Sequence, residues 1–269
     1  MDKAHKRAEP SVIFEDRDFI VINKPAGLLV HRTLAKREET TLVEWILARY
    51  PEVKSVGDSS TDSTRSPQAS SGQVNLRPGI VHRLDRETSG VMLVARSQKG
   101  FTFLKQIFQK HEIKKTYLAL VWGRVKDKKG SIKTPIGLKT GTTRHTVRGK
   151  NVKLMKEART DYRVLKRFGT GEEELTLLTV MPQTGRTHQI RVHLASIGYP
   201  VVGDALYGGK ARYEKSRTLS VFRQFLHADS IEFTGPDGSR LRFSADLPSD
   251  LSEALALLLP VPLDSRQYS

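Results

Sequence analysis

The 269-residue chain has a globular composition, with 38% hydrophobic and 7% aromatic residues, enough for one large or two modest domains. It contains no cysteine, which excludes disulfides, cysteine nucleophiles and thiolate metal sites. No run of about 18 apolar residues occurs, and the polar N-terminal segment has no signal-peptide core. We therefore expect a soluble, unsecreted, cytoplasmic protein. A bacterial cytoplasm fits, and an organelle stays open.

Positive charge is concentrated in one part of the chain. Residues 96–168 hold 21 Lys and Arg against four acidic residues, a net charge of +17, whereas the whole chain carries +16. Charge this localised suits a phosphate-binding surface, because neutralising phosphates releases condensed counterions. Nucleic acid is the favoured partner. A solvated basic face remains the alternative, and no strongly amphipathic basic helix supports binding to an anionic membrane.

The predicted elements begin with a hairpin. Short β-rich runs at 12–14 and 19–22 are separated by four charged residues. Thr41 and Glu44 then match a helix capping box, and helical spacing continues to Arg49 before Pro51 ends it.

Residues 55–73 are dominated by Ser, Thr, Asp, Gly and Gln, which cannot bury enough apolar surface to offset chain entropy. They predict a flexible surface loop within a domain. It is either a tolerated insertion or a flap that contacts RNA.

The later elements alternate hairpins with occasional helices. Apolar spacing after Ser97 predicts a helix with Phe101, Leu104, Ile107 and Phe108 on one face. Further strands are expected at 91–95, 116–122, 174–181, 231–233 and 241–243, and further helices at 187–197 and 251–259. Without a βαβ repeat, this order predicts an α+β fold with a mixed, largely antiparallel central sheet and flanking helices. We expect a single domain over 11–260, between a polar tail at 1–10 and a C-terminal tail at 261–269.

A candidate nucleophile lies in the segment 82–90, which reads HRLDRETSG. Asp85 stands between Arg83 and Arg86, and adjacent cations favour the charged form of a carboxylate. An ionised Asp85 suits attack on an electrophile. The alternative is an aspartate that caps the next turn and pairs with a neighbouring arginine.

A second candidate segment, residues 183–193, reads QTGRTHQIRVH. The expected helix places Ile190, Leu194 and Ile197 on a core stripe and Arg191 on another face, beside His188. Arg191 is then a natural partner for a catalytic carboxylate, or else a surface arginine bound to a backbone carbonyl.

The two histidines of this segment invite a metal interpretation. His188 and His193 are five residues apart, and no glutamate follows the first as in HExxH, so we expect no metal. Structural or RNA-contacting imidazoles fit the pattern better.

Five segments together resemble the RluA-type RNA pseudouridine synthases, and the resemblance runs from about residue 11 to residue 250. They are INKPAGLLVH (22–31), HRLDRETSG (82–90), KKTYLALVWG (114–123), TGRTHQIRVHLASIGYPVVGDALYG (184–208) and FLHAD (225–229). The resemblance implies the pseudouridine synthase fold with a central RNA-binding cleft. It also implies isomerisation of selected uridines in structured RNA to pseudouridine, without metal or organic cofactor.

The resemblance implies roles for individual residues. Asp85 matches the essential aspartate, Tyr117 the tyrosine that stacks on the target uracil, and Arg191 the arginine that pairs with the aspartate. Arg83 matches the residue that fills the gap left by the flipped nucleotide. His82, His188 and Arg186 complete the candidate RNA contacts, whereas Asp204 and Tyr207 are assigned structural roles. Without the resemblance, an ordinary strand aromatic is the favoured interpretation of Tyr117.

The reaction path stays open, because an ionised Asp85 could act at the anomeric carbon, assist formation of a glycal, or add to C6 of the ring.

Many family members carry an S4-like domain before the catalytic part, and here only about ten residues precede the first predicted strand. We therefore expect target selection by the catalytic domain itself, with a stem-loop of rRNA or tRNA as partner. A monomer without an obligate protein partner is expected.

Two other functions compete with this interpretation. One is a catalytically silent RNA-binding or ribosome-assembly factor on the same fold. The other is a glycosidase-like hydrolase, which usually needs a second positioned carboxylate, and none stands out near Asp85.

Overall fold

The computed structural model describes most of the chain and divides it into two compact units. The described residues are 8–31, 40–58, 77–142, 144–149, 152–169 and 173–261. Unit 1 comprises residues 1–113 and 231–245, and unit 2 comprises residues 114–230 and 246–269. Most of the predicted 55–73 loop and most of each predicted tail lie outside the described residues. The expectation of a single domain over 11–260 stays a prediction.

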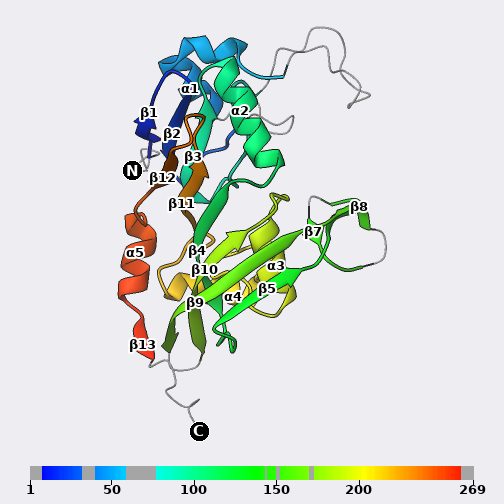
Figure 1. The fold of residues 1–269 in the computed structure, drawn as a ribbon. Coiled ribbons are helices and arrows are strands. Elements are labelled where there is room, and N and C mark those ends of the chain that lie inside the picture. The colour runs from blue at the N-terminus through cyan, green and yellow to red at the C-terminus, as the bar shows by residue number, and fades with distance from the viewer. Residues whose placement is uncertain are drawn as a thin grey trace. The chain divides into compact units, whose positions relative to one another are not determined.

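Unit 1 is built on antiparallel strands (Figure 1). They are β1 (Ser11–Glu15), β2 (Phe19–Lys24), β3 (Ser89–Ala95), β12 (Arg240–Ser244) and the part of β11 (Leu226–Thr234) that belongs to this unit. β2 pairs with β1 on one side and with β3 on the other, which confirms the predicted hairpin. Every residue of β3 is buried, as its apolar sequence predicts.

The helices of unit 1 follow the capping signals in the sequence. They are α1 (Leu42–Arg49), the 3₁₀ turn η1 (Pro51–Ser55) and α2 (Gln98–Gln109). Thr41 and Glu44 form the predicted capping box, and Ser97 caps α2 by accepting from the Gly100 amide. Phe101, Leu104 and Ile107 of the predicted apolar face of α2 are buried, Phe108 is partly exposed, and this helix packs against β3.

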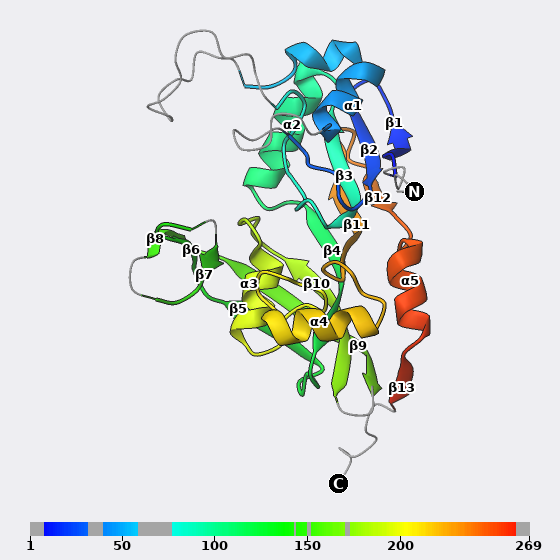
Figure 2. The ribbon, with the colours of Figure 1, turned by 180° about the vertical axis from the view of Figure 1, so that it is seen from behind.

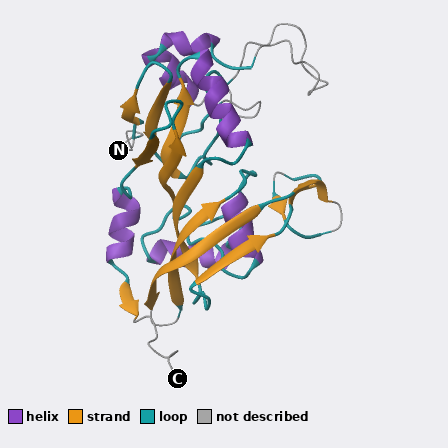
Figure 3. Cartoon of the chain, in the orientation of Figure 1, coloured by secondary structure: helices purple, strands orange, loops and turns teal. Residues whose placement is uncertain are grey.

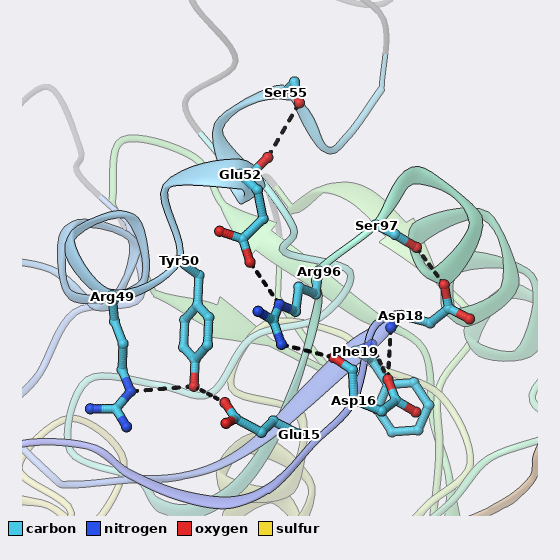
Figure 4. A network of polar contacts seen from close by, with 10 residues as sticks. All are labelled: Glu15, Asp16, Asp18, Phe19, Arg49, Tyr50, Glu52, Ser55, Arg96 and Ser97. Atoms are coloured by element: carbon cyan, nitrogen blue, oxygen red, sulfur yellow. Dashed lines mark hydrogen bonds and ion pairs between the residues drawn. The ribbon is translucent and has the colours of Figure 1, made fainter.

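A polar network joins the β1–β2 turn, η1 and the end of β3 within unit 1 (Figure 4). Arg96 donates from Nε to the Glu52 carboxylate at 2.7 Å and from Nη1 to the Asp16 carbonyl at 3.1 Å. Its guanidinium also lies 5.1 Å from the ring centroid of Tyr50. Because Arg96 and Glu52 are substantially exposed, their ion pair fixes geometry more than it adds stability.

Unit 2 is also built on antiparallel strands. Its strands are β4 (Lys114–Trp122), β5 (Lys129–Lys133), β9 (Arg159–Gly169), β10 (Glu174–Pro182) and β13 (Leu259–Val261). β10 pairs with β4 and β9, and β9 also pairs with β5 and β13. The two units together confirm the predicted α+β class with largely antiparallel pairing, as the strands and helices in Figure 3 show.

Three short strands form a separate small sheet that projects from the side of unit 2 (Figure 1). They are β6 (Ile136–Lys139), β7 (His145–Thr146) and β8 (Val152–Lys156). We call this element, residues 136–156, the small sheet. Its exposed cations are Lys139, Arg144, Arg148, Lys153 and Lys156. These residues belong to the positively charged segment 96–168, in which no sheet was predicted.

The helices of unit 2 are α3 (Gln189–Ser196), α4 (Lys210–Thr218) and α5 (Ser249–Ala256). α3 packs against β9 and β10, and α3 and α4 lie on the same face of these strands (Figure 2). α4 was not predicted.

The predicted bounds of two helices are wrong. The helix expected at 187–197 begins at Gln189, because His188 has a left-handed backbone with φ 55°. Ile197 lies beyond the end of α3 and is 38% exposed, so it is not part of the core stripe. The helix expected at 251–259 ends at Ala256, and Leu259 instead begins β13.

Candidate active site

Asp85 lies in unit 1, in the irregular segment that leads into β3. Its side chain is half-buried, and its carbonyl accepts from the Thr88 amide at 3.1 Å, which closes a turn. Leu84 before it is buried, whereas Arg83 is exposed. The segment therefore anchors itself through Leu84 and leaves the neighbouring Arg83 in contact with solvent.

Arg86 has a structural contact that the sequence analysis did not assign. Its Nε donates to the Gly27 carbonyl at 3.1 Å, and the Gly27 amide donates back to the Arg86 carbonyl at 2.9 Å. Gly27 has a φ of 81°, which a residue without a Cβ adopts readily. This reciprocal pair ties the Asp85 segment to the turn that follows β2.

Lys24 fixes the same region from inside unit 1. The side chain is fully buried, and its ammonium donates to the carbonyls of Pro25, Leu28 and Arg86 at 2.7, 2.9 and 3.0 Å. Three donors meet three backbone acceptors, which compensates for removing the cation from water. Lys24 lies in the segment INKPAGLLVH, and no role was predicted for it. Its place at the end of the apolar strand FIVINK is the signal that could have indicated one.

Two histidines of unit 1 are held within the fold near this segment. His82 accepts from the Leu93 amide through Nε2 at 2.9 Å and stacks on Phe108 with ring centroids 4.5 Å apart. His31 is buried, and burial together with the charges of Arg77 and Arg83 lowers its pKa to about 4. His31 is therefore neutral at pH 7. An RNA contact by His82 stays a prediction, and these contacts give it a structural role as well.

Tyr117 lies in β4 of unit 2, opposite Val180 of β10, and packs against the core of that unit. Lys115 precedes it by two residues and so points to the same face of the strand. The Lys115 ammonium donates to the Thr184 carbonyl at 3.2 Å, and burial lowers its pKa to about 8. Sequence reasoning did not single out Lys115.

Arg191 lies in α3 and is 8% exposed. Its guanidinium makes a bidentate pair with the buried carboxylate of Asp204, Nε to Oδ2 at 2.7 Å and Nη2 to Oδ1 at 2.9 Å. This side-on geometry leaves three N–H groups outside the Asp204 pair. The predicted pairing of Arg191 with Asp85 stays a prediction, because the two residues belong to different units.

A buried amide holds the start of α3. Gln189 donates from Nε2 to the Arg159 carbonyl at 2.9 Å and to Thr160 Oγ1 at 3.0 Å. Its Oε1 accepts from Thr184 Oγ1 at 2.6 Å and from the Arg186 amide at 3.0 Å. All four hydrogen-bonding positions of the amide are used, which fixes the rotation and entry of the helix that carries the catalytic candidate.

His193 extends this network on the next turn of α3. Its Nε2 donates to the Thr134 carbonyl at 2.9 Å, and its Nδ1 lies 2.8 Å from Thr160 Oγ1. Burial lowers the pKa of His193, which keeps the imidazole neutral. In the described part of the chain, no group of three or more His, Asp or Glu side chains is arranged to hold a metal ion.

The remaining predicted RNA contacts also lie in unit 2. Arg186 donates from Nε to the Glu157 carbonyl at 3.0 Å, and His188 Nδ1 lies 2.9 Å from the hydroxyl of Tyr207. Both side chains are partly exposed, and their roles toward RNA stay predictions.

Within the described ranges, every helix is too short or too polar to span a bilayer.

Comparison with known proteins gives a consistent result. The family model described as RNA pseudouridylate synthase matches residues 18–196, more than half of the chain. An uncharacterized RNA pseudouridine synthase of Chloroflexus aurantiacus is 41% identical over 237 residues, which cover 88% of this chain and 65% of the relative. A ribosomal large subunit pseudouridine synthase D of Pseudomonas aeruginosa is 37% identical over 261 residues, which cover 93% of this chain and 72% of the relative.

The fold has solved counterparts. The structure titled Human RNA Pseudouridylate Synthase Domain Containing 1 matches with a TM-score of 0.70 and 25% identity, covering 97% of this chain and 92% of that one. The chain spans 65% and 60% of the length of its relatives from Chloroflexus aurantiacus and Aquifex aeolicus. The family match and these identities confirm the resemblance found in the sequence: the chain belongs to the RNA pseudouridine synthase family.

Proposed function

We propose that this protein is an isomerase that converts selected uridines of structured RNA to pseudouridine. The observation that carries the proposal is the family match over residues 18–196, which contains all three catalytic candidates, Asp85, Tyr117 and Arg191. The joint presence of Asp85, Tyr117 and Arg191 argues against a silent binding factor, because binding to RNA phosphates does not require an acidic side chain.

The reaction exchanges one bond of the uracil for another. The bond between C1′ of the ribose and N1 of the base breaks, and a bond between C1′ and C5 forms. The proton on C5 is lost to solvent or a base, and N1 gains a proton. The overall change is an isomerisation, so no oxidant or reductant is consumed.

Three side chains receive roles in this proposal. Asp85 acts as the ionised carboxylate, whichever of the three paths the reaction follows. Arg191 keeps that carboxylate charged and oriented, because its own position is held by the bidentate pair with Asp204. Tyr117 supplies a π face on which the extruded uracil stacks, and such stacking is worth about 1–3 kcal/mol per base.

Base extrusion needs compensation for lost stacking, and Arg83 is the proposed substitute. Its exposed position next to Asp85 supports that role. The exposed cations of the small sheet support binding to RNA phosphates, with His82, Arg186 and His188 as further proposed contacts.

Large-subunit rRNA is the first substrate to test. The relatives from Pseudomonas aeruginosa, Nitrosomonas europaea and Vibrio cholerae are named ribosomal large subunit pseudouridine synthase D, at 36–37% identity. A tRNA stem-loop is the second substrate.

The test uses unmodified transcripts of bacterial large-subunit rRNA and of tRNA labelled with tritium at C5 of uridine. Because C5 loses its hydrogen in the reaction, each turnover releases one tritium to water. We expect release from at least one transcript, with the modified position mapped by sequencing. Wild-type protein that binds both RNAs and releases no tritium would instead support the silent binding factor.

A further inference from the structure

Tyr207 contacts two arginines of unit 2. The guanidinium carbon of Arg191 lies 5.1 Å from the centroid of the tyrosine ring, and that of Arg144 lies 5.4 Å from it. Both distances fall within the range of cation–π attraction. One arginine is the catalytic candidate in α3, and the other is an exposed cation of the small sheet.

Asp204 determines where this ring lies. The same carboxylate that pairs with Arg191 accepts from the backbone amides of Leu206 and Tyr207 through Oδ1, at 2.9 and 3.0 Å. One buried acid therefore holds the edge of the guanidinium and the backbone of the residue that covers its face. The carboxylate accepts four hydrogen bonds in all, two from Arg191 and two from backbone amides. These hydrogen bonds to one side chain fix the placement of Arg191 relative to Tyr207.

The hydroxyl of Tyr207 reaches the small sheet. Its oxygen accepts from the backbone amide of His145, the first residue of β7, at 3.1 Å. It also lies 2.9 Å from His188 Nδ1, and the rings of His145 and His188 meet edge to face at 5.6 Å. A single phenol oxygen thus connects the small sheet to the residue that precedes α3.

An apolar cluster supports the same connection. Ile136 of β6, Ala158 and Val192 of α3 are buried together, and Val147 and Tyr207 pack against them. The ring of Tyr207 consequently packs against a core to which both a strand of the small sheet and α3 contribute. Movement of the small sheet must disturb this ring.

From these contacts we propose that Tyr207 is a positioning residue that couples the small sheet to Arg191. The inference rests on the proposed function, in which Arg191 orients the catalytic aspartate and the small sheet binds RNA. The ring of Tyr207 keeps the guanidinium of Arg191 in its productive orientation. The hydroxyl keeps the small sheet docked, so that RNA bound there stabilises the same arrangement.

Electrostatics gives the coupling a direction. Two guanidinium groups share one ring and repel each other. Asp204 offsets the charge of Arg191, and an RNA phosphate bound at the exposed Arg144 would offset the other charge. RNA on the small sheet therefore favours the arrangement in which both arginines contact the ring.

The experiment separates the ring from the hydroxyl with the tritium-release assay. Tyr207→Phe keeps the ring and loses two hydrogen bonds, so we expect KM for the RNA transcript to rise about fivefold while kcat stays within about twofold. Tyr207→Leu also loses the ring, and we expect kcat to fall about tenfold. Tyr199→Phe is the matched control, because Tyr199 is a partly buried tyrosine packed on the core of the same unit. It should leave both constants unchanged.

A double-mutant cycle keeps the proposal testable if Tyr207→Leu fails to fold. Arg144→Gln changes an exposed side chain, and we expect it to raise KM by about fivefold in the wild type and by much less in Tyr207→Phe. Equal effects of Arg144→Gln in both backgrounds, or a wild-type kcat for a folded Tyr207→Leu, would overturn the coupling. Tritium release by the wild type separates that result from failure of the proposed function.

Discussion

Lys24 and Arg191 are both buried cations, and the two units neutralise them in different ways. In unit 1, Lys24 donates to three backbone carbonyls. In unit 2, Arg191 faces a carboxylate and a tyrosine ring. The contacts of Lys24 hold backbone segments together, whereas those of Arg191 hold its guanidinium against two side chains.

The chemistry of the two side chains explains the division. A lysine ammonium is a compact charge with three donors, which suits carbonyls that converge from several directions. A guanidinium is a planar fork that binds one carboxylate along one edge and keeps donors on another. Lys24 therefore determines the path of the Asp85 segment through the Arg86 carbonyl, whereas Arg191 can present an oriented charge.

The largest effect is expected from removing the ammonium of Lys24. Lys24→Met fills a similar volume but leaves buried carbonyls without their donors, each at a cost of about 1–3 kcal/mol. We expect the free energy of unfolding to fall by about 3 kcal/mol. We also expect activity to be lost, because the segment that carries Asp85 is no longer held in place. Chemical denaturation and tritium release measure the two effects.

Lys99→Met is the matched control for this change. Lys99 is 69% exposed and lies 3.9 Å from Asp18, so its loss should change stability by less than about 0.5 kcal/mol. Equal stabilities of the two variants would show that Lys24 does not hold the fold of unit 1.

A smaller effect on folding and a large one on catalysis are expected for Arg191→Lys. Lysine keeps the charge opposite Asp204 but cannot make the bidentate pair, so the charge is retained and its orientation is lost. We expect kcat to fall about a hundredfold, which corresponds to about 2.7 kcal/mol, with a modest loss of stability. Arg159→Lys, at an exposed arginine of the same unit, is the control. A kcat near that of the wild type would remove the oriented guanidinium from the mechanism.

The smallest effect is a pH dependence of stability that both units share. Burial lowers the pKa of His31 to about 4 and also lowers the pKa of His193, so the unfolded chain takes up protons near pH 6.5 that the folded chain does not. Stability is therefore highest above pH 6.5 and falls as the pH drops toward 4. For His31 alone we expect a loss of roughly 1–2 kcal/mol between pH 6.5 and pH 5.

Variants at one histidine at a time measure how much each unit contributes to this pH dependence. His31→Gln and His193→Gln should each flatten part of the decrease measured by urea unfolding at several pH values. A slope that neither substitution changes would mean that these imidazoles titrate as they do in the unfolded chain.

Much of the fold follows from local sequence signals. The capping box at Thr41 and Glu44, the apolar face of α2 and the buried strand β3 are determined by contacts within a few residues or by continuous apolar sequence. The family resemblance of the catalytic segments is likewise present in the sequence.

Other features depend on contacts between distant residues. The left-handed His188 shortens α3, and its ring meets Tyr207 nineteen positions later. Asp204 looked structural because glycines surround it, and its pairing with Arg191 required the fold. The small sheet is too short and too polar to show a clear period. The pattern of residues within a short segment cannot predict contacts between residues that are far apart in the sequence.

The central claim is that Asp85 carries the reaction, and Asp85→Asn tests it most directly. The amide preserves shape and removes the negative charge. With the RNA transcript that the wild type modifies, we predict that tritium release is abolished while the Kd for that RNA stays within a few-fold, because the exposed cations supply binding. Tritium release by Asp85→Asn at the wild-type rate would contradict the assignment.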